Sequence, residues 1–206
     1  SIRTDKHFYS GLMMCKSVFT CPICGPVIRA RKAEELRAVL EAHSASGGGW
    51  GFFTFTAPHT RADDPKVLLR KMKLAEAGFW RSRAVKRIMN KVGFIESIKV
   101  WEHTYGHAFG FHSHSHQLVA MDSGIDLAEL QLLLFPHWEN YCLKRGLNRP
   151  SKERGLHIQA GSNAAKYVAK IDSVDEAGLA KELTRGDHKL AGQGHFQPFD
   201  LLALVA

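Results

Sequence analysis

The sequence lacks the long apolar runs of membrane and secreted proteins. No stretch of its 206 residues approaches the roughly 18 consecutive apolar residues that a transmembrane helix needs. Residues 1–14 contain no apolar run of the length found in secretory signals. A glycine-rich phosphate loop of the helicase type is also missing, so any unwinding of nucleic acid needs a partner. These absences predict a cytoplasmic protein that makes no membrane contact.

Acidic residues are scarce relative to basic ones. The chain has 20 Asp+Glu against 28 Lys+Arg, a formal net charge of +8, and this excess favours a polyanionic partner because neutralised phosphates release counterions. The imbalance is greatest in residues 65–91, which contain nine basic residues and one acid, Glu76. Such a stretch is either a solvated helix face or a surface that faces DNA. On the second interpretation, the DNA-binding residues are Arg70, Lys73, Arg81, Arg83, Lys86 and Arg87.

Cysteines are too few and too clustered for a disulfide framework. The four are Cys15, Cys21, Cys24 and Cys142. The first three form a C-x₅-C-x₂-C pattern that is typical of a metal site, and tetrahedral zinc needs a fourth ligand. His7 is the nearest candidate in sequence, while Cys142 and His107 could reach the site through the fold. Residues 1–27 are therefore predicted to form a cysteine-rich zinc knuckle; the alternative is a set of free buried cysteines.

The remaining residues, 28–206, are predicted to form one α+β domain. With 45% hydrophobic residues the chain can bury a core. Periodicity and turn residues predict helices at 28–43, 65–91, 126–145, 163–171 and 175–184, and strands at 50–56, 94–104, 109–121 and 156–159. A hairpin combined with helical crossovers indicates a central antiparallel sheet of ferredoxin-like type with helices packed on one face.

The segment His112-Ser113-His114-Ser115-His116 lies within a predicted strand. Side chains alternate along a strand, so the three imidazoles share one face, and two histidines spaced in this way can bind one metal ion. Glu102, on the neighbouring predicted strand, is in line with apolar residues and would complete a His/His/carboxylate site. Otherwise Glu102 lies beyond the buried part of its strand and the histidines are ordinary surface residues. A site of this kind with open positions suits Mg²⁺ or Mn²⁺ at a phosphate oxygen.

A tyrosine follows at helical spacing with two polar neighbours. Asn163, Tyr167 and Lys170 share one face of the predicted helix. A tyrosine hydroxyl is a weak nucleophile at its ordinary pKa and needs activation by a metal or a base. A lysine one turn away could hold a phosphate or steady the phenolate. The Y-x-x-K pattern alone is weak, and a core or surface tyrosine is the default interpretation.

Taken in order, these motifs resemble those of the rolling-circle replication initiators of bacterial plasmids and phages, members of the HUH endonuclease superfamily. Phe53-Thr54-Phe55-Thr56 resembles the first family motif, His114-Ser115-His116 the paired histidines, and Tyr167-Val168-Ala169-Lys170 the nucleophile motif. The segment from Gly11 to Cys24 and the segment Pro198-Phe199-Asp200-Leu201-Leu202 are similar to flanking regions of one branch of the family. The similarity therefore covers nearly the whole chain.

The resemblance implies a metal-dependent nickase that acts on single-stranded DNA at a replication origin or an origin hairpin. A metal held by His114, His116 and Glu102, with His112 as a helper, polarises the scissile phosphate. Tyr167 attacks the phosphate, which leaves a 5′-phosphotyrosine and a free 3′-OH that primes synthesis, and Lys170 stabilises the phosphate. The expected partners are the DNA, a host helicase and a host polymerase.

Three positions depart from the family pattern. Ser115 stands where a hydrophobic residue is usual, so the ligating pair is either 114/116, which we favour, or 112/114. Asn163 replaces the glutamate of some relatives, and Ile171 stands where others have a second tyrosine, which predicts a single-tyrosine enzyme. The alternatives are a single-tyrosine transposase, a relaxase and a non-enzymatic zinc-knuckle DNA-binding protein. Relaxases usually place the tyrosine before the histidines, contrary to the order found here.

Overall fold

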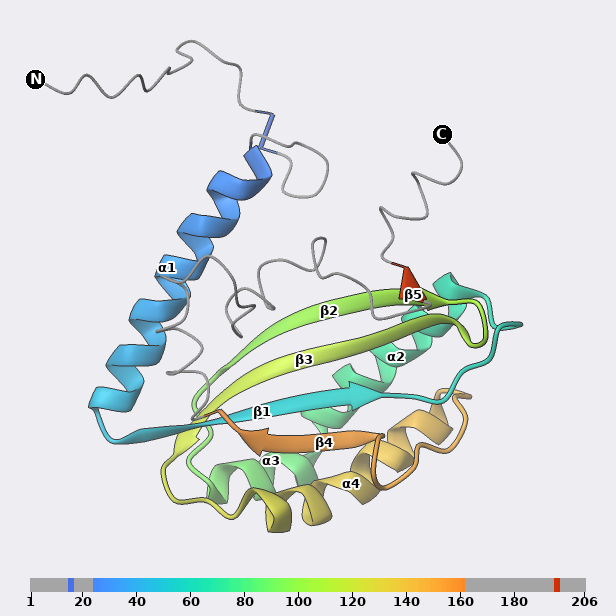
Figure 1. The fold of residues 1–206 in the computed structure, drawn as a ribbon. Coiled ribbons are helices and arrows are strands. Elements are labelled where there is room, and N and C mark those ends of the chain that lie inside the picture. The colour runs from blue at the N-terminus through green and yellow to red at the C-terminus, as the bar shows by residue number, and fades with distance from the viewer. Residues whose placement is uncertain (1–14, 17–23, 162–194, 197–206) are drawn as a thin grey trace, which may run out of the picture.

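An antiparallel sheet with helices on both faces makes up the part of the chain that the computed structural model describes, residues 15–16, 24–161 and 195–196 (Figure 1). The strands are β1 (Gly48–Thr56), β2 (Ser97–Gly106), β3 (Gly110–Asp122), β4 (Leu156–Ala160) and β5 (His195–Phe196), in the order β4-β1-β3-β2-β5. Every neighbouring pair is antiparallel. The helices are α1 (Cys24–Ala45), α2 (Pro65–Arg81), α3 (Arg83–Lys91) and α4 (Leu127–Lys144). The predicted α+β class is confirmed, and the order β4-β1-β3-β2 with helical crossovers is the ferredoxin-like arrangement.

One face of the sheet carries the main core. Phe53 and Phe55 of β1 and Val119 and Met121 of β3 point to this face, because alternate strand residues share a side. They pack against buried residues of the three helices that cover it, namely Leu68, Met72 and Phe79 of α2, Val85 and Met89 of α3, and Leu134, Trp138 and Cys142 of α4. The Trp138 Nε1 donates a hydrogen bond of 3.0 Å to the Thr56 carbonyl, which ties α4 to the end of β1.

The opposite face carries a smaller apolar cluster. Phe52 and Leu118, one position away from the core residues of their strands, are buried there against Leu36 and Leu40 of α1. In Figure 1, α1 stands on this side of the sheet and the other helices lie on the far side. Beyond this cluster the same face carries the even-numbered residues of β3, which include the three histidines.

The helix predicted over 65–91 is wrong as a single element, because Ser82 divides it. The Ser82 backbone is extended, with φ −60° and ψ 131°. The Ser82 amide donates a hydrogen bond to the Phe79 carbonyl, and the Ser82 carbonyl accepts one from the Lys86 amide. The new direction lets α3 bury Val85 and Met89. The N-terminal cap of α2 is Asp64, whose carboxylate accepts hydrogen bonds from two backbone amides of the first turn.

Two further expectations concern the start of α1 and the predicted elements that lie outside the described residues. Helix α1 begins at Cys24, four residues before the predicted start at residue 28, so this cysteine belongs to the helix. The helices predicted at 163–171 and 175–184 lie outside the described residues, as does most of the predicted knuckle. Within the described part of the chain, no helix is long and apolar enough to cross a membrane.

Candidate metal centre

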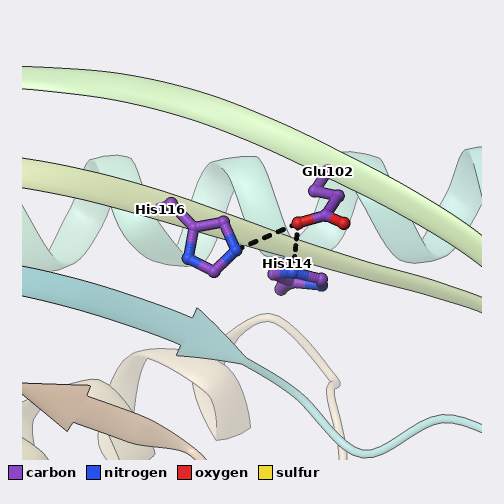
Figure 2. Close-up of side chains that lie close together, drawn as sticks. All are labelled: Glu102, His114 and His116. Atoms are coloured by element: carbon purple, nitrogen blue, oxygen red, sulfur yellow. Dashed lines mark hydrogen bonds and ion pairs between the residues drawn. The ribbon is translucent and has the colours of Figure 1, made fainter. Parts of the chain in front are cut away.

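Glu102, His114 and His116 converge on the face of the sheet that α1 partly covers. In the β2–β3 ladder Glu102 lies directly opposite His114, and His116 is the next residue on the same side of β3. One carboxylate oxygen, Oε2 of Glu102, lies 3.0 Å from the Nε2 of His114 and 3.1 Å from the Nε2 of His116 (Figure 2). The three atoms lie within 4.8 Å of one another, so this group could hold a metal ion.

The group is buried, so its carboxylate needs a hydrogen-bond donor or a cation as a partner. Glu102 is 6% exposed and His116 is 8% exposed. A carboxylate taken out of water at this depth is costly unless it is paired with donors or bound to a cation. The structure therefore rejects the alternative in which Glu102 lies beyond the buried part of its strand. Two imidazoles and a carboxylate form a donor set that fits a divalent ion and leaves further coordination positions open.

Two residues of β1 hold the His116 ring. The Thr54 Oγ1 forms a hydrogen bond of 3.0 Å with the His116 Nδ1. The Phe52 ring stacks on the imidazole, with centroids 5.0 Å apart and planes 16° from parallel. Engagement of Nδ1 leaves the Nε2 lone pair for a metal, which is the usual way that a second residue orients a histidine ligand. The sequence did not indicate this role of Thr54; only its position in the strand next to the histidines could have suggested it.

The histidine row continues beyond the converging group. The ring centroids of His112 and His114 are 4.9 Å apart, and those of His59 and His112 are also 4.9 Å apart. Among the described residues, the group of converging ligand atoms contains His114 and His116 and not His112, which favours 114/116 as the pair. His59 belongs to the loop after β1, where no sequence pattern pointed to it.

Ser115 faces the other side of the sheet and has a partner there. Its hydroxyl donates a short hydrogen bond to the Oε2 of Glu76, a residue of α2 that is 1% exposed. The Lys99 Nζ donates to the Oε1 of the same carboxylate at 2.5 Å. The single acid of the basic stretch is thus a buried residue beneath the metal centre. A buried carboxylate needs hydrogen-bond donors, and the Ser115 hydroxyl is one of them.

Ser113, the other serine of the strand, pairs with His103 at 2.9 Å between Oγ and Nδ1. Burial lowers the pKa of His103, and the nearby positive charge of Lys73 lowers it further. Both serines between the histidines therefore form hydrogen bonds on the side of the sheet that α2, α3 and α4 cover. The histidines themselves lie on the other side.

The cysteines separate into two places. The Cys15 and Cys24 sulfur atoms lie 3.7 Å apart. Tetrahedral zinc with Zn–S bonds of about 2.3 Å places two sulfurs about 3.8 Å apart, so this pair has the spacing of two zinc ligands. Cys21 and His7 lie outside the described residues. Cys142 is buried in the core on the opposite face of the sheet, where burial raises the pKa of its thiol to about 12, so the structure removes it as a fourth ligand.

The basic residues predicted to bind DNA are exposed but do not surround the metal centre. They are Arg70, Lys73 and Arg81 of α2 and Arg83, Lys86 and Arg87 of α3. Both helices pack on the face of the sheet opposite Glu102. Lys73 lies over the ring of Trp101 at 5.7 Å.

Tyr167 and Lys170 lie outside the described residues. Their assignment as nucleophile and phosphate-binding lysine therefore stays a prediction from the motif.

Comparison with known proteins finds similarity to a Rep protein over almost the entire chain. The chain is 26% identical over 250 aligned residues to a Streptomyces lividans protein named "Protein rep"; the match covers 95% of this chain and 54% of that protein. It is 27% identical over 133 residues to a Streptomyces cyanogenus "Neomycin resistance protein", a match that covers 53% of this chain and 30% of the relative. The chain thus spans about half the length of the first relative, and less of the second. No family model and no solved structure matches. The first match supports the resemblance to Rep proteins that the motif order indicates.

Proposed function

We propose that the chain is a single-stranded DNA endonuclease and strand transferase of the HUH type, which nicks a replication origin to initiate rolling-circle replication. The observation that carries this proposal is the convergence of the His114 Nε2, the His116 Nε2 and the Glu102 Oε2 on adjacent strands. The similarity to a Rep protein supports the biological setting. The net charge of +8 suits a nucleic-acid partner.

Glu102, His114 and His116 would hold a divalent ion, Mg²⁺ or Mn²⁺. When bound, the ion supplies positive charge to a phosphate oxygen and so stabilises the charge that develops during phosphoryl transfer. The chain contributes rigidity. The ligands come from paired strands rather than loops, Thr54 fixes the orientation of His116, and Phe52 packs along its ring.

The covalent step belongs to Tyr167 in this proposal. Its phenolic oxygen forms a bond to phosphorus while the bond from phosphorus to the 3′ oxygen breaks, and that oxygen takes up a proton to become the 3′-OH primer. The phenol proton leaves to solvent or to a base. Attack of a 3′-OH on the phosphotyrosine reverses the step and joins strands, so no oxidant or nucleotide is consumed. Lys170 places a positive charge near the phosphate.

Residues 15–24 would bind a structural zinc ion through Cys15, Cys21 and Cys24, with His7 as the candidate fourth ligand. The separation of 3.7 Å between the Cys15 and Cys24 sulfurs supports this proposal. Zinc binding would contribute free energy to the folding of this segment.

A cleavage assay with triad variants tests the nickase proposal. The substrate is a labelled pool of single-stranded oligonucleotides that includes origin-like sequences, with Mn²⁺ present. We expect cleavage by the wild-type chain, its loss in Glu102→Gln and His116→Ala, and its loss with EDTA. His157→Ala is the matched control, because His157 is an exposed histidine of β4 outside the triad. Tight DNA binding without cleavage under any divalent metal would favour the non-enzymatic DNA-binding protein instead.

A further inference from the structure

Helix α3 presents a basic face that has no structural use within the described residues. Arg83, Lys86, Arg87 and Lys91 are all exposed and follow one another at helical spacing, while Val85 and Met89 are buried on the other side of the helix. Residues 81–95 contain no acid. None of the four cations forms an ion pair with any other residue that the structure describes. A row of unpaired like charges is unfavourable for the isolated fold and needs another explanation.

This basic face is on the far side of the sheet from the metal centre. Val85 and Met89 belong to the core that contains Phe53 and Met121, whereas the triad shares its face with Phe52. Figure 1 shows α3 beneath the sheet and α1 above it. A DNA strand bound at Glu102 and the histidines does not pass over α3 without rounding the edge of the sheet. The basic face therefore serves a different segment of nucleic acid.

The surface has the chemistry of a phosphate-binding rather than a base-binding site. Single-stranded DNA is usually bound by aromatic stacking in addition to charge. Among the described residues, the only exposed aromatic of the large hydrophobic class is Phe109, in the β2–β3 turn and not on α3. Duplex DNA has its bases already stacked and offers a regular backbone. From Arg83 to Lys91 the helix spans about 12 Å, long enough for its cations to meet several phosphates of a duplex.

We infer that the basic face of α3 (Arg83, Lys86, Arg87, Lys91) binds the phosphate backbone of duplex DNA, while the opposite face of the sheet acts on the single strand. The inference rests on the proposed function, since it assigns the duplex that adjoins a nicked site. It adds a second DNA-binding surface, which contacts phosphates through charge alone. The affinity of such a surface depends steeply on salt concentration.

The test compares Arg83→Gln/Lys86→Gln/Arg87→Gln/Lys91→Gln with a control that removes the same charge elsewhere. The control is Lys144→Gln/Arg145→Gln/Lys152→Gln/Arg154→Gln, which alters four exposed cations at the end of α4 and in the loop before β4. Binding to a labelled 30-base-pair duplex is followed by fluorescence anisotropy over a NaCl series. We expect the α3 variant to lose at least about tenfold in affinity at 0.1 M NaCl, with the slope of log K against log salt smaller by about 3 to 4. Circular dichroism and a melting curve establish that both variants are folded.

Nicking of a short single-stranded oligonucleotide is measured in parallel and is expected to stay within about twofold of wild type. Equal duplex affinities and equal salt slopes in the two variants would overturn the inference. It would also be overturned if the α3 variant lost binding to phosphatidylserine vesicles while its duplex binding stayed unchanged. The two proposals fail in different ways. A wild-type chain that never nicks, with the duplex effect intact, removes the nickase proposal only; nicking without a duplex effect removes the α3 assignment only.

Discussion

The ion pair beneath the metal centre yields a prediction with a definite asymmetry. Glu76 is 1% exposed, whereas its partner Lys99 keeps 45% of its side chain in solvent. Lys99→Met therefore leaves a buried carboxylate with the Ser115 hydroxyl but no cation, while the removed ammonium had little desolvation to recover. Breaking a fully buried pair in this way costs about 3–5 kcal/mol. The exposure of Lys99 lowers our expectation to about 2–3 kcal/mol, a fall in Tm of about 5–10 °C for a chain of this size.

Glu76→Gln in the same background tests the cause. Removing the stranded charge should restore about half or more of the stability lost in Lys99→Met, so the two substitutions are strongly non-additive. Urea unfolding gives the four free energies of unfolding in the cycle, and the m values of the four proteins are compared. A double variant whose destabilisation equals the sum of the single variants would refute the account, because the buried charge would then not be the source of the cost.

Three further predictions concern the metal centre and the cysteines. Thr54→Val should weaken Mn²⁺ binding about 10- to 100-fold in calorimetry, and Thr54→Ser, which keeps the hydroxyl, should retain it; equal affinities would remove the positioning role of Thr54. Cys142 should resist alkylation in the native protein at pH 8, because its pKa of about 12 keeps the thiol protonated, and should react on unfolding. Cys24→Ser should lower the zinc content measured by elemental analysis from about one per chain to near zero; an unchanged zinc content would argue against the knuckle.

Much of the fold could be predicted because its strands carry clear patterns. The alternation of histidines and serines in β3 and the apolar line that ends at Glu102 placed the three converging side chains on one face before any tertiary contact was known. The antiparallel register then followed from the hairpin between β2 and β3. The break at Ser82 could not be predicted from local pattern, because serine is tolerated inside helices. After the break, α3 buries Val85 and Met89 in the core.

The supporting contacts could not be predicted from local pattern. Thr54 meets His116 across 62 positions and Ser115 meets Glu76 across 39, so each pairing depends on the strand order and the crossover helix. A stretch with nine basic residues and one acid could be either a solvated helix face or a DNA-facing surface. Only the tertiary structure showed that its acid is buried and that its cations lie on the side away from the histidines.

The central claim, tyrosine attack at a metal-assisted phosphate, is tested most directly by mass spectrometry of the protein after incubation with single-stranded origin-like DNA and Mn²⁺. The account predicts a nucleotide adduct on the peptide that contains Tyr167, absent in Tyr167→Phe, in Glu102→Gln and in the presence of EDTA. Cleaved DNA with no covalent adduct, or an adduct that persists in Tyr167→Phe, would contradict it.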